Sequence, residues 1–397
     1  MGRIGIYGGT FNPPHVGHFQ GAQYALEALA LDKLWMIPCH NAPHKAMPLD
    51  APSPRQRLDM VSLGLGDARI EASPIELDRQ GTSYTWETVA QMRKLYPEAE
   101  LFLLMGTDMF ETFLRWKNPE RIFREATLAV LCRGDKRGKE TVTSAKRALE
   151  EKGARIVILD NPVTEISSSD LRRMLAFDCA KAYLSEKVMS YIQTNGLYGT
   201  GRNLRALSIE ELEQVVTGLL KPNRVAHVLG CRQTAVELAR LYGADEVDAA
   251  RAALLHDITK ALDGPLQLTL CREYGIMLDA FSSQNPKTLH ALTGSLVAQR
   301  IFGEGKAVVD AIRSHTTGKA DMSLLEKILY VADYMEPNRN FPGVEQLRSL
   351  AYTDITRALQ LGLEMTLDML RSQKREISPQ SLDALRFLTK RTENPNG

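Results

Sequence analysis

The spacing of apolar residues changes halfway along the 397-residue chain. In the first half, short apolar runs alternate with stretches in which apolar residues recur every three or four positions. The runs predict strands at residues 4–7, 34–38, 101–106, 127–133 and 155–160. Between them, segments such as 54–65 and 85–96 have helical spacing. Strands that alternate with helices predict βαβ units and a parallel sheet with both faces covered.

From about residue 208 the strand signal disappears and the helical period continues. The clearest helical segments are 208–220, 234–243, 247–262, 292–303 and 323–336. Between the halves, residues 196–207 contain three glycines and few apolar anchors, which is typical of a linker. We therefore predict an α/β doubly wound domain over 1–198, a linker over 199–207 and an all-α domain over 208–391.

Composition narrows the class of protein. The chain is 44% apolar and 24% charged, and its net charge of +1 gives no electrostatic footprint for nucleic acid or an anionic membrane. Five cysteines without a C-x-x-C pair indicate a reducing compartment. No apolar run approaches the roughly 18 residues of a membrane span, and the early strand leaves no room for a signal peptide. We expect a cytoplasmic protein, and the sequence leaves open whether it is a homo-oligomer.

The segment "GIYGGTFNPPHVGH" (5–18) suggests a phosphate site. Gly8 and Gly9 end a strand and let the backbone come close to a ligand. His15 and His18 then open a helical segment and share one of its faces. A helix N-terminus offers unpaired N–H groups, and imidazoles add further donors for phosphate oxygens. The alternative, histidines that only cap the helix, is less favoured because H-x-x-H follows directly on the Gly-Gly turn.

These residues resemble a known family. "GGTFNPPHVGH" resembles the signature of the H-x-G-H nucleotidyltransferases, and "ISSSDLR" (166–172) resembles their second motif. "NAPHK", "TSYTWET", "MGTDMF", "RWKNP" and "YIQTNGLY" follow in the order found in bacterial nicotinate-nucleotide adenylyltransferases, over essentially all of 1–198. The resemblance implies a Rossmann-like fold and AMP transfer from Mg-ATP to nicotinate mononucleotide, which yields nicotinate adenine dinucleotide and pyrophosphate. Glu87 replaces the expected Asp, a mild departure.

The resemblance also implies roles for single residues. His18 would stabilise charge at the α-phosphorus, His15 would hold ATP phosphates, and Lys45 would add a mobile cation. Arg172 would hold the leaving pyrophosphate. The other nucleotide contacts would come from Gly8, Gly9, Phe11, Gly106, Asp108, Ser167 and Ser168. The nicotinate nucleotide pocket would be lined by Thr82, Tyr84, Thr85 and Trp116, with the tryptophan stacked on the pyridine ring.

A second interpretation keeps this fold but changes the phosphate acceptor. The acceptor would then be a pantetheine phosphate or a polyol phosphate. The "SYT" stretch and Trp116 argue against this alternative, because those acceptors offer no pyridine ring to stack.

The second half contains a different set of chemical groups. Four of the eight histidines lie between residues 227 and 315, and one belongs to an H-D pair within the apolar segment "ARAALLHDITKAL". Burial of this pair without a partner would cost several kcal/mol on roughly estimated scales. Histidine and carboxylate ligands suit iron, manganese or zinc better than magnesium alone. The candidate metal ligands are His227, His256, Asp257, His290, His315 and Asp333.

The order H…HD…H…H…D resembles the HD-domain phosphohydrolases with a two-metal site. Residues 314–344 resemble small HD proteins that hydrolyse diadenosine tetraphosphate symmetrically, and this resemblance spans about 208–390. It implies two transition-metal ions, with iron our first expectation, and Asp257 as the bridge between them. His227, His256 and Asp333 would complete one coordination sphere, and His290 and His315 the other.

Two cationic residues of the second half are candidates for substrate contacts, and two other functions are possible for this half. Lys260, one turn after His256, is a candidate contact for a substrate phosphate, and Arg339 is a weaker one. The helical half could instead be a broader nucleotide phosphohydrolase, or a regulatory module that senses nucleotides without hydrolysing them. The full set of six ligands counts against a pure sensor.

Overall fold

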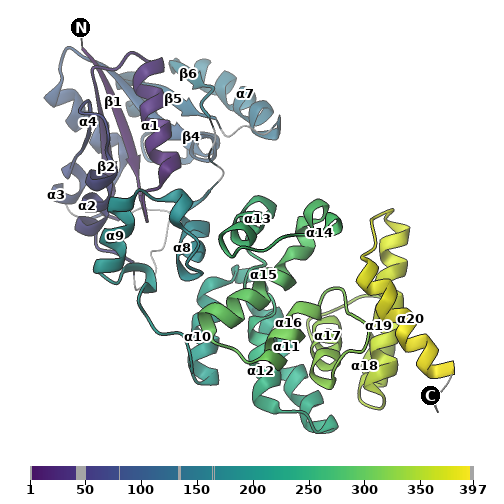
Figure 1. The fold of residues 1–397 in the computed structure, drawn as a ribbon. Coiled ribbons are helices and arrows are strands. Elements are labelled where there is room, and N and C mark those ends of the chain that lie inside the picture. The colour runs from purple at the N-terminus through teal and green to yellow at the C-terminus, as the bar shows by residue number, and fades with distance from the viewer. Residues whose placement is uncertain are drawn as a thin grey trace. The chain divides into compact units, whose positions relative to one another are not determined.

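The structure, a computed structural model, describes residues 2–41, 51–79, 81–132, 136–162, 164 and 166–393. The chain divides into two compact units, residues 1–202 and residues 203–397. Figure 1 shows the first unit in purple to teal and the second in green to yellow. The fold class expected from the sequence, an α/β unit followed by an all-α unit, is confirmed.

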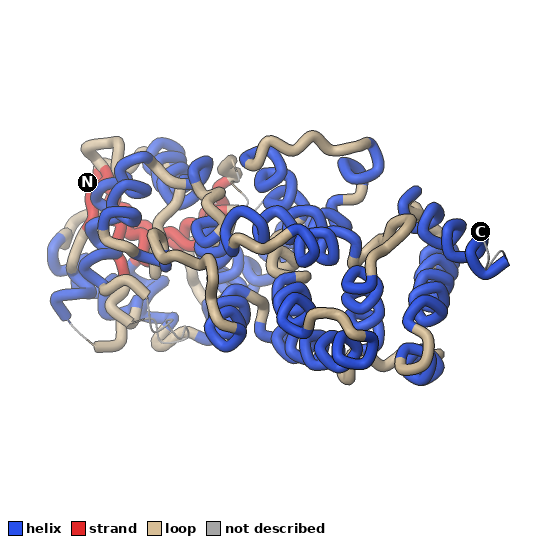
Figure 2. Tube along the Cα trace, turned by 60° about the horizontal axis from the view of Figure 1, so that its bottom comes forward, coloured by secondary structure: helices blue, strands red, loops and turns tan. Residues whose placement is uncertain are grey.

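Unit 1 is built on one six-stranded sheet in the order β3-β2-β1-β4-β5-β6, with every neighbouring pair parallel. The strands are β1 (Arg3–Gly9), β2 (Lys33–Pro38), β3 (Ile70–Ala72), β4 (Glu100–Gly106), β5 (Ala126–Leu131) and β6 (Ile156–Leu159). Figure 2 shows these strands in red within unit 1. Five of the six correspond to the predicted runs. The three-residue β3 was missed because so short a segment shows no period.

Helices cover both faces of this sheet, because alternate residues of its strands enter two separate apolar clusters. Leu101 and Leu103 of β4 belong to one cluster, and Phe102 and Leu104 belong to the other. The helices of unit 1 are α1 (Val16–Ala28), α2 (Pro54–Gly64), α3 (Ile75–Arg79), α4 (Thr85–Leu95), α5 (Thr107–Glu111), α6 (Pro119–Glu125), α7 (Lys136–Glu150), α8 (Ser168–Ala176) and α9 (Glu186–Thr194), with 3₁₀ turns η1 (Phe113–Arg115), η2 (Lys181–Tyr183) and η3 (Leu197–Gly199).

The strand order fixes where a ligand can bind in unit 1. The chain leaves β1 toward β2 and β3 on one side, and β4 then pairs with the other side of β1. The direction of strand addition therefore reverses between β1 and β4. In open parallel sheets, ligands bind outside the carboxyl ends of the strands at such a switch point.

Unit 2 is helical throughout its described residues. Its helices are α10 (Ile209–Leu219), α11 (Pro222–Tyr242), α12 (Glu246–Leu255), α13 (Gly264–Glu273), α14 (Ala280–Gln284), α15 (Leu289–Val297), α16 (Lys306–Ser314), α17 (Leu324–Met335), α18 (Val344–Ala351), α19 (Ile355–Ser372) and α20 (Pro379–Glu393). A 3₁₀ turn, η4 (Pro286–Thr288), precedes α15, and a π turn, η5 (Ala298–Phe302), follows it. α11 packs against α12 and α17, and α16 packs against α15 and α17. None of the helices among the described residues is long and apolar enough to cross a bilayer.

One predicted helix of unit 2 is shorter than expected. The apolar period predicts a helix over 247–262, whereas α12 ends at Leu255 and a series of turns follows. Ile258 and Lys260 donate their backbone N–H groups to carbonyls three residues earlier, at 3.1 and 2.9 Å. These short-range bonds replace the helical pattern. His256 and Asp257 therefore lie in a turn at the end of a helix.

Candidate functional sites

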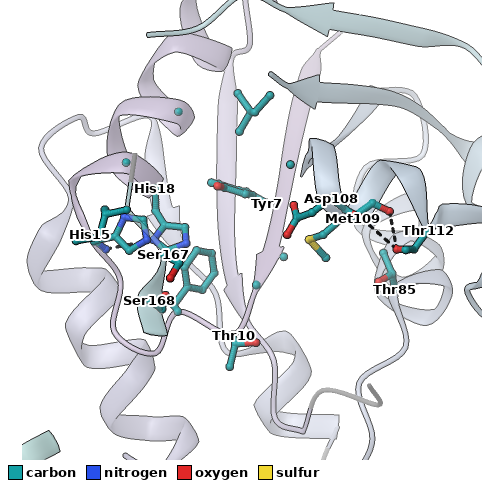
Figure 3. Close-up of a pocket in the computed structure, with 18 of the residues that line it drawn as sticks. Tyr7, Thr10, His15, His18, Thr85, Asp108, Met109, Thr112, Ser167 and Ser168 are labelled. Atoms are coloured by element: carbon teal, nitrogen blue, oxygen red, sulfur yellow. Dashed lines mark hydrogen bonds between the residues drawn. The ribbon is translucent and has the colours of Figure 1, made fainter. Parts of the chain in front are cut away.

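Unit 1 has a cavity of about 530 Å³ at the carboxyl ends of β1 and β4 (Figure 3). The cavity therefore lies at the switch point of the sheet. The predicted site residues that line it are Gly8, Gly9, Phe11, His15, His18, Tyr84, Thr85, Gly106, Asp108, Trp116, Ser167 and Ser168. These residues come from segments far apart in the sequence, and the fold brings them together.

The two glycines at the end of β1 have different surroundings. A Cβ on Gly9 would lie 2.9 Å from the ring of Phe11, too close for two carbon atoms. A Cβ on Gly8 would meet nothing within 4 Å, so the backbone there borders open space. Phe11 has a φ of 47°, and its buried ring packs edge-on against Tyr7 and His18. Main chain, rather than side chains, therefore bounds this part of the cavity.

The two histidines at the start of α1 form a connected pair. The backbone N–H of His15 donates to Nδ1 of His18 at 3.2 Å, and the ring centroids are 3.7 Å apart. Because Nδ1 of His18 accepts a hydrogen bond, the neutral ring carries its proton on Nε2. Figure 3 shows both rings beside Ser167 at the edge of the cavity. His18 is thus prepared to donate a hydrogen bond from Nε2.

The second motif holds the loop that precedes these histidines. Arg172 donates to the carbonyl of Asn12 at 2.7 Å, and the hydroxyl of Ser168 donates to the carbonyl of Pro13 at 3.2 Å. Tyr198 donates to the side-chain carbonyl of Asn12 at 2.7 Å. The Arg172 side chain is not among those that line the cavity as described. Its expected contact with pyrophosphate stays a prediction.

The opposite side of the cavity is aromatic and carries one cation. Trp116 is half-buried, and its ring centroid lies 5.2 Å from that of Phe113. The ammonium of Lys117 lies 4.1 Å from the centre of the Tyr84 ring. Thr82 is exposed and is not among the lining residues, whereas its neighbour Ser83 is.

Lys45, a predicted site residue, lies outside the described residues. Other residues of this site were not predicted from the sequence. Further lining residues include Tyr7, Ser83, Met109, Thr112, Lys117 and Asn161. Arg57 of α2 was also missed. It is 1% exposed and donates to the carbonyls of Thr10, Cys39 and His40 at 2.7 to 3.0 Å, which fixes the ends of β1 and β2. The position of Arg57 next to the apolar Leu58 in an amphipathic helix is the signal that could have identified this residue.

Unit 2 brings all six predicted metal ligands into one cluster. His227 comes from α11, His256 and Asp257 from the turn after α12, and the remaining three from α15, the end of α16, and α17. All four histidines and Asp257 are buried, and Asp333 is half-buried.

Asp257 lies in the middle of the cluster, with one oxygen facing each set of imidazoles. Its Oδ2 atom is 3.5 Å from Nε2 of His256 and 3.8 Å from Nε2 of His227. Its Oδ1 atom is 3.4 Å from Nε2 of His290 and 3.8 Å from Nε2 of His315. Its two oxygens are thus arranged so that they can serve two sets of ligands at once.

The backbone orients three of the four imidazoles. Nδ1 of His256, His290 and His315 lies 2.7, 2.9 and 2.6 Å, respectively, from the carbonyl oxygen three residues earlier. A carbonyl can only accept, so Nδ1 carries the proton in each ring. The lone pair of each neutral ring is therefore on Nε2, the atom that faces Asp257. Hydrogen bonds at the second nitrogen orient metal-binding histidines in this way.

Two histidines and the central carboxylate are in protonation states that suit a metal ion, whereas burial lowers but Asp257 and Asp333 together raise the pKa of His256. Burial lowers the pKa of His290 to about 3 and that of His315 to about 4. Burial opposes ionisation of Asp257, but the facing imidazoles and Lys260 hold its pKa well below the usual range. Neutral imidazole and ionised carboxylate are the forms that bind metals. Two groups of three residues each bring their donor atoms within 4.8 Å of one another. The first group is His227, His256 and Asp333, and the second is His256, Asp257 and His315. These residues fit a divalent metal.

Three cations surround the cluster. Arg224 forms an ion pair with Asp257, and Arg339 forms one with Asp333 at 2.7 Å. Nζ of Lys260 is 2.9 Å from Nε2 of His290. Lys260 and Arg339 were predicted near this site. Arg224 was missed, although its place three residues before His227, on the same helix face, was a usable signal.

Comparison with known proteins gives each unit a family. A Cytidylyltransferase-like model matches residues 6–174, and an HD domain model matches residues 224–338. A Dictyoglomus thermophilum protein named "Probable nicotinate-nucleotide adenylyltransferase" is 38% identical over 198 residues, which cover 49% of this chain and 99% of that protein. Two proteins named "Bis(5'-nucleosyl)-tetraphosphatase, symmetrical" match the other half. The one from Halalkalibacterium halodurans is 42% identical over 170 residues (43% of this chain, 90% of that protein), and the one from Bacillus subtilis is 39% identical over 172 residues (43% and 91%).

The two family models match separate parts of the chain, and each relative corresponds to about half of it. Each relative is nevertheless covered over at least nine-tenths of its own length. The chain therefore belongs, through its first half, to the nicotinate-nucleotide adenylyltransferase family and, through its second half, to the HD-domain family of the symmetrical bis(5'-nucleosyl)-tetraphosphatases.

Proposed function

We propose that unit 1 transfers AMP from ATP to nicotinate mononucleotide. The observation that supports this most directly is the His15–His18 pair at the start of α1, beside the Gly-Gly turn of β1. It places the His18 ring and the N-terminus of α1 at the cavity, where they can face phosphate oxygens. The family relationship supports the same reaction.

The reaction is an in-line displacement at the α-phosphorus of ATP. A phosphate oxygen of the mononucleotide forms the new P–O bond, and pyrophosphate leaves with the electrons of the broken one. His18 stabilises charge on the α-phosphoryl oxygens, His15 holds ATP phosphates, and Arg172 holds the departing pyrophosphate. Mg²⁺ that accompanies ATP neutralises part of the phosphate charge. Catalysis of this kind depends on positioning and electrostatics, which matches a site whose histidines and loop are held by hydrogen bonds.

The acceptor binds on the aromatic side of the cavity. Trp116 stacks on the pyridine ring, and Tyr84 and Thr85 line the pocket beside it. A test compares nicotinate mononucleotide, nicotinamide mononucleotide and phosphopantetheine as acceptors with the full-length protein. We expect efficient turnover of the first only. Preference for phosphopantetheine would establish the alternative acceptor class.

We propose that unit 2 hydrolyses dinucleoside polyphosphates at its six-ligand cluster, with diadenosine tetraphosphate cleaved symmetrically into two ADP. A pair of divalent metal ions, with iron the first expectation, supplies Lewis-acid polarisation of phosphate oxygens and a more acidic water. Asp257 faces both sets of imidazoles. Lys260 and Arg339 contact His290 and Asp333 at the edge of the cluster, and these two cations would turn to substrate phosphates. The two-sided placement of the Asp257 oxygens is the observation that carries this proposal.

Product analysis tests this second activity against its alternatives. Symmetrical hydrolysis gives ADP alone, whereas asymmetrical hydrolysis gives ATP and AMP. Comparable turnover of ordinary nucleotides would instead indicate a broader phosphohydrolase. Tight binding of diadenosine tetraphosphate without any turnover, in protein loaded with Fe²⁺ or Mn²⁺, would indicate a sensor.

A further inference from the structure

One histidine of the metal cluster is oriented differently from the other three. Nδ1 of His227 faces a side chain, that of Glu336, whose Oε1 atom is 3.1 Å away. Glu336 is 1% exposed and lies directly after the end of α17, three residues beyond Asp333. It contacts a candidate ligand but is not itself one of the six.

The carboxylate of Glu336 is fixed at both oxygens. Its Oε2 atom accepts hydrogen bonds from the backbone and side-chain N–H groups of Asn338, both at 2.8 Å. The backbone carbonyl of Glu336 accepts from Arg348 at 2.9 Å. With Oε2 occupied, Oε1 is directed at His227. A carboxylate can only accept, so the proton of the imidazole lies on Nδ1 and the lone pair lies on Nε2.

α11 is shaped to receive this carboxylate. Gly230 lies on the same helix face as His227, three residues later. A Cβ at position 230 would overlap Oε2 of Glu336 and would lie 3.0 Å from Nδ2 of Asn338. The absence of a side chain at Gly230 therefore makes the space that the buried carboxylate fills.

We propose that Glu336 is a positioning residue that orients His227 as a metal ligand and keeps the lone pair on its Nε2 atom. This proposal rests on the metal-dependent function proposed for unit 2. A carboxylate partner at Nδ1 fixes the tautomer and the ring orientation of a metal-binding histidine. The cluster then holds three histidines oriented by main chain and one oriented by a side chain.

A purely structural role makes a different prediction. If Glu336 only secures the loop that contains Asn338, its loss lowers stability but leaves metal affinity unchanged once the protein is folded. The measurement must therefore be metal binding by the full-length protein, without nucleotide. Competition between the protein and a chelator for Mn²⁺ gives this affinity directly, and the melting temperature in excess chelator reports stability separately.

Two variants disturb the contact between Glu336 and His227. One changes the charge of the side chain at position 336, and the other changes its place. Glu336→Gln removes the charge at constant shape. Gly230→Ala leaves the carboxylate present but displaces it, and alanine favours a helix more than glycine does. We expect each variant to bind Mn²⁺ about 10- to 100-fold more weakly than the wild type. Because Gly230→Ala strengthens helix propensity, weaker binding there cannot come from a weaker helix.

Glu304→Gln is the matched control. The side chain of Glu304 in unit 2 is only 4% exposed, but its partner is Arg251, and no histidine contact of Glu304 is among those described. This variant should have a lower melting temperature in chelator and wild-type affinity for Mn²⁺. Wild-type affinity in Glu336→Gln or in Gly230→Ala overturns the positioning role, as does an equal loss in Glu304→Gln. Failure of the wild-type protein to bind Mn²⁺ would overturn the metal-dependent function itself, which is a distinguishable result.

Discussion

In unit 1, the cavity at the ends of β1 and β4 is bounded by glycine backbone, by the starts of helices and by side chains from many segments of the chain. In unit 2, the cluster consists of six side chains that reach a common centre from five stretches of chain. The first arrangement follows from the topology of the sheet, so most of its geometry survives the loss of one side chain. The second exists only when the helices are packed and each ligand is present. Substitutions should therefore have graded effects in unit 1 and nearly all-or-none effects in unit 2.

The largest expected effect is that of Asp257→Ala. The variant loses the carboxylate that faces both ligand sets, so we expect bound metal and ADP release from diadenosine tetraphosphate to fall to background. The melting temperature of unit 2 should also fall, because Arg224 loses its ion-pair partner. Metal analysis and both activity assays on the full-length variant test this expectation.

Asp263→Asn provides the control, since Asp263 caps α13 in the same unit. It should keep its metal and its hydrolysis. Synthesis of nicotinate adenine dinucleotide should be normal in both variants. Loss of both activities in Asp257→Ala would contradict the independence of the two sites.

His18→Ala is expected to lower kcat for dinucleotide synthesis by about 10²- to 10³-fold, the usual effect of losing one donor to transition-state charge. KM for ATP should change little, because His18 acts mainly on charge that develops during the reaction. His15→Ala should weaken ATP binding more than His18→Ala does. Steady-state kinetics tests these expectations. An unchanged kcat with a raised KM in His18→Ala would contradict the role of His18 in stabilising transition-state charge.

Trp116→Ala tests the aromatic side of the same cavity. Loss of stacking is worth about 1–3 kcal/mol by analogy with base stacking, so KM for the mononucleotide should rise by roughly 5- to 150-fold. KM for ATP should stay near its wild-type value. Equal losses for both substrates would mean that Trp116 supports the packing around Phe113 instead.

Metal removal changes stability and should do so in unit 2 alone. Ligand binding at 100 times Kd stabilises a fold by about 2.7 kcal/mol, so excess chelator should lower the melting temperature of unit 2 by roughly 5–10 °C. The transition of unit 1 should not move. Differential scanning calorimetry with and without chelator measures this, and Asp257→Ala should show no response. A shift in both transitions would show that the metal does not act on unit 2 alone.

The sequence predicts most of the fold because continuous apolar runs such as 101–106 and long periodic segments such as 323–336 carry strong signals. It fails where few residues decide the outcome. The three-residue β3 is too short to have a period, and the turn at 256–262 breaks a helix without glycine or proline. Local backbone bonds and the packing of Asp257 decide that turn, and neither is visible in the apolar pattern.

Some residues of the candidate sites could be predicted from the sequence, and others could not. Motif residues such as His18 and Asp257 could be named because their chemistry is concentrated in short segments. Arg57 and Glu336 could not, because their partners are 17 to 109 residues away and become neighbours only in the fold. The contact between Lys117 and Tyr84 could not be predicted from the sequence either, because nothing around position 117 distinguishes it from an ordinary exposed lysine.

The hydrogen bond from Tyr198 to Asn12 has a consequence for the timing of synthesis. The two residues are 186 positions apart, so a ribosome that adds 5–20 residues per second needs roughly 10 to 40 s to supply the second after the first. During that interval the loop before His15 lacks one of its supports. Nascent chains that end before residue 198 should therefore contain the whole sheet yet hold the histidines less firmly than the finished protein, and the transferase should mature only as its last turn emerges.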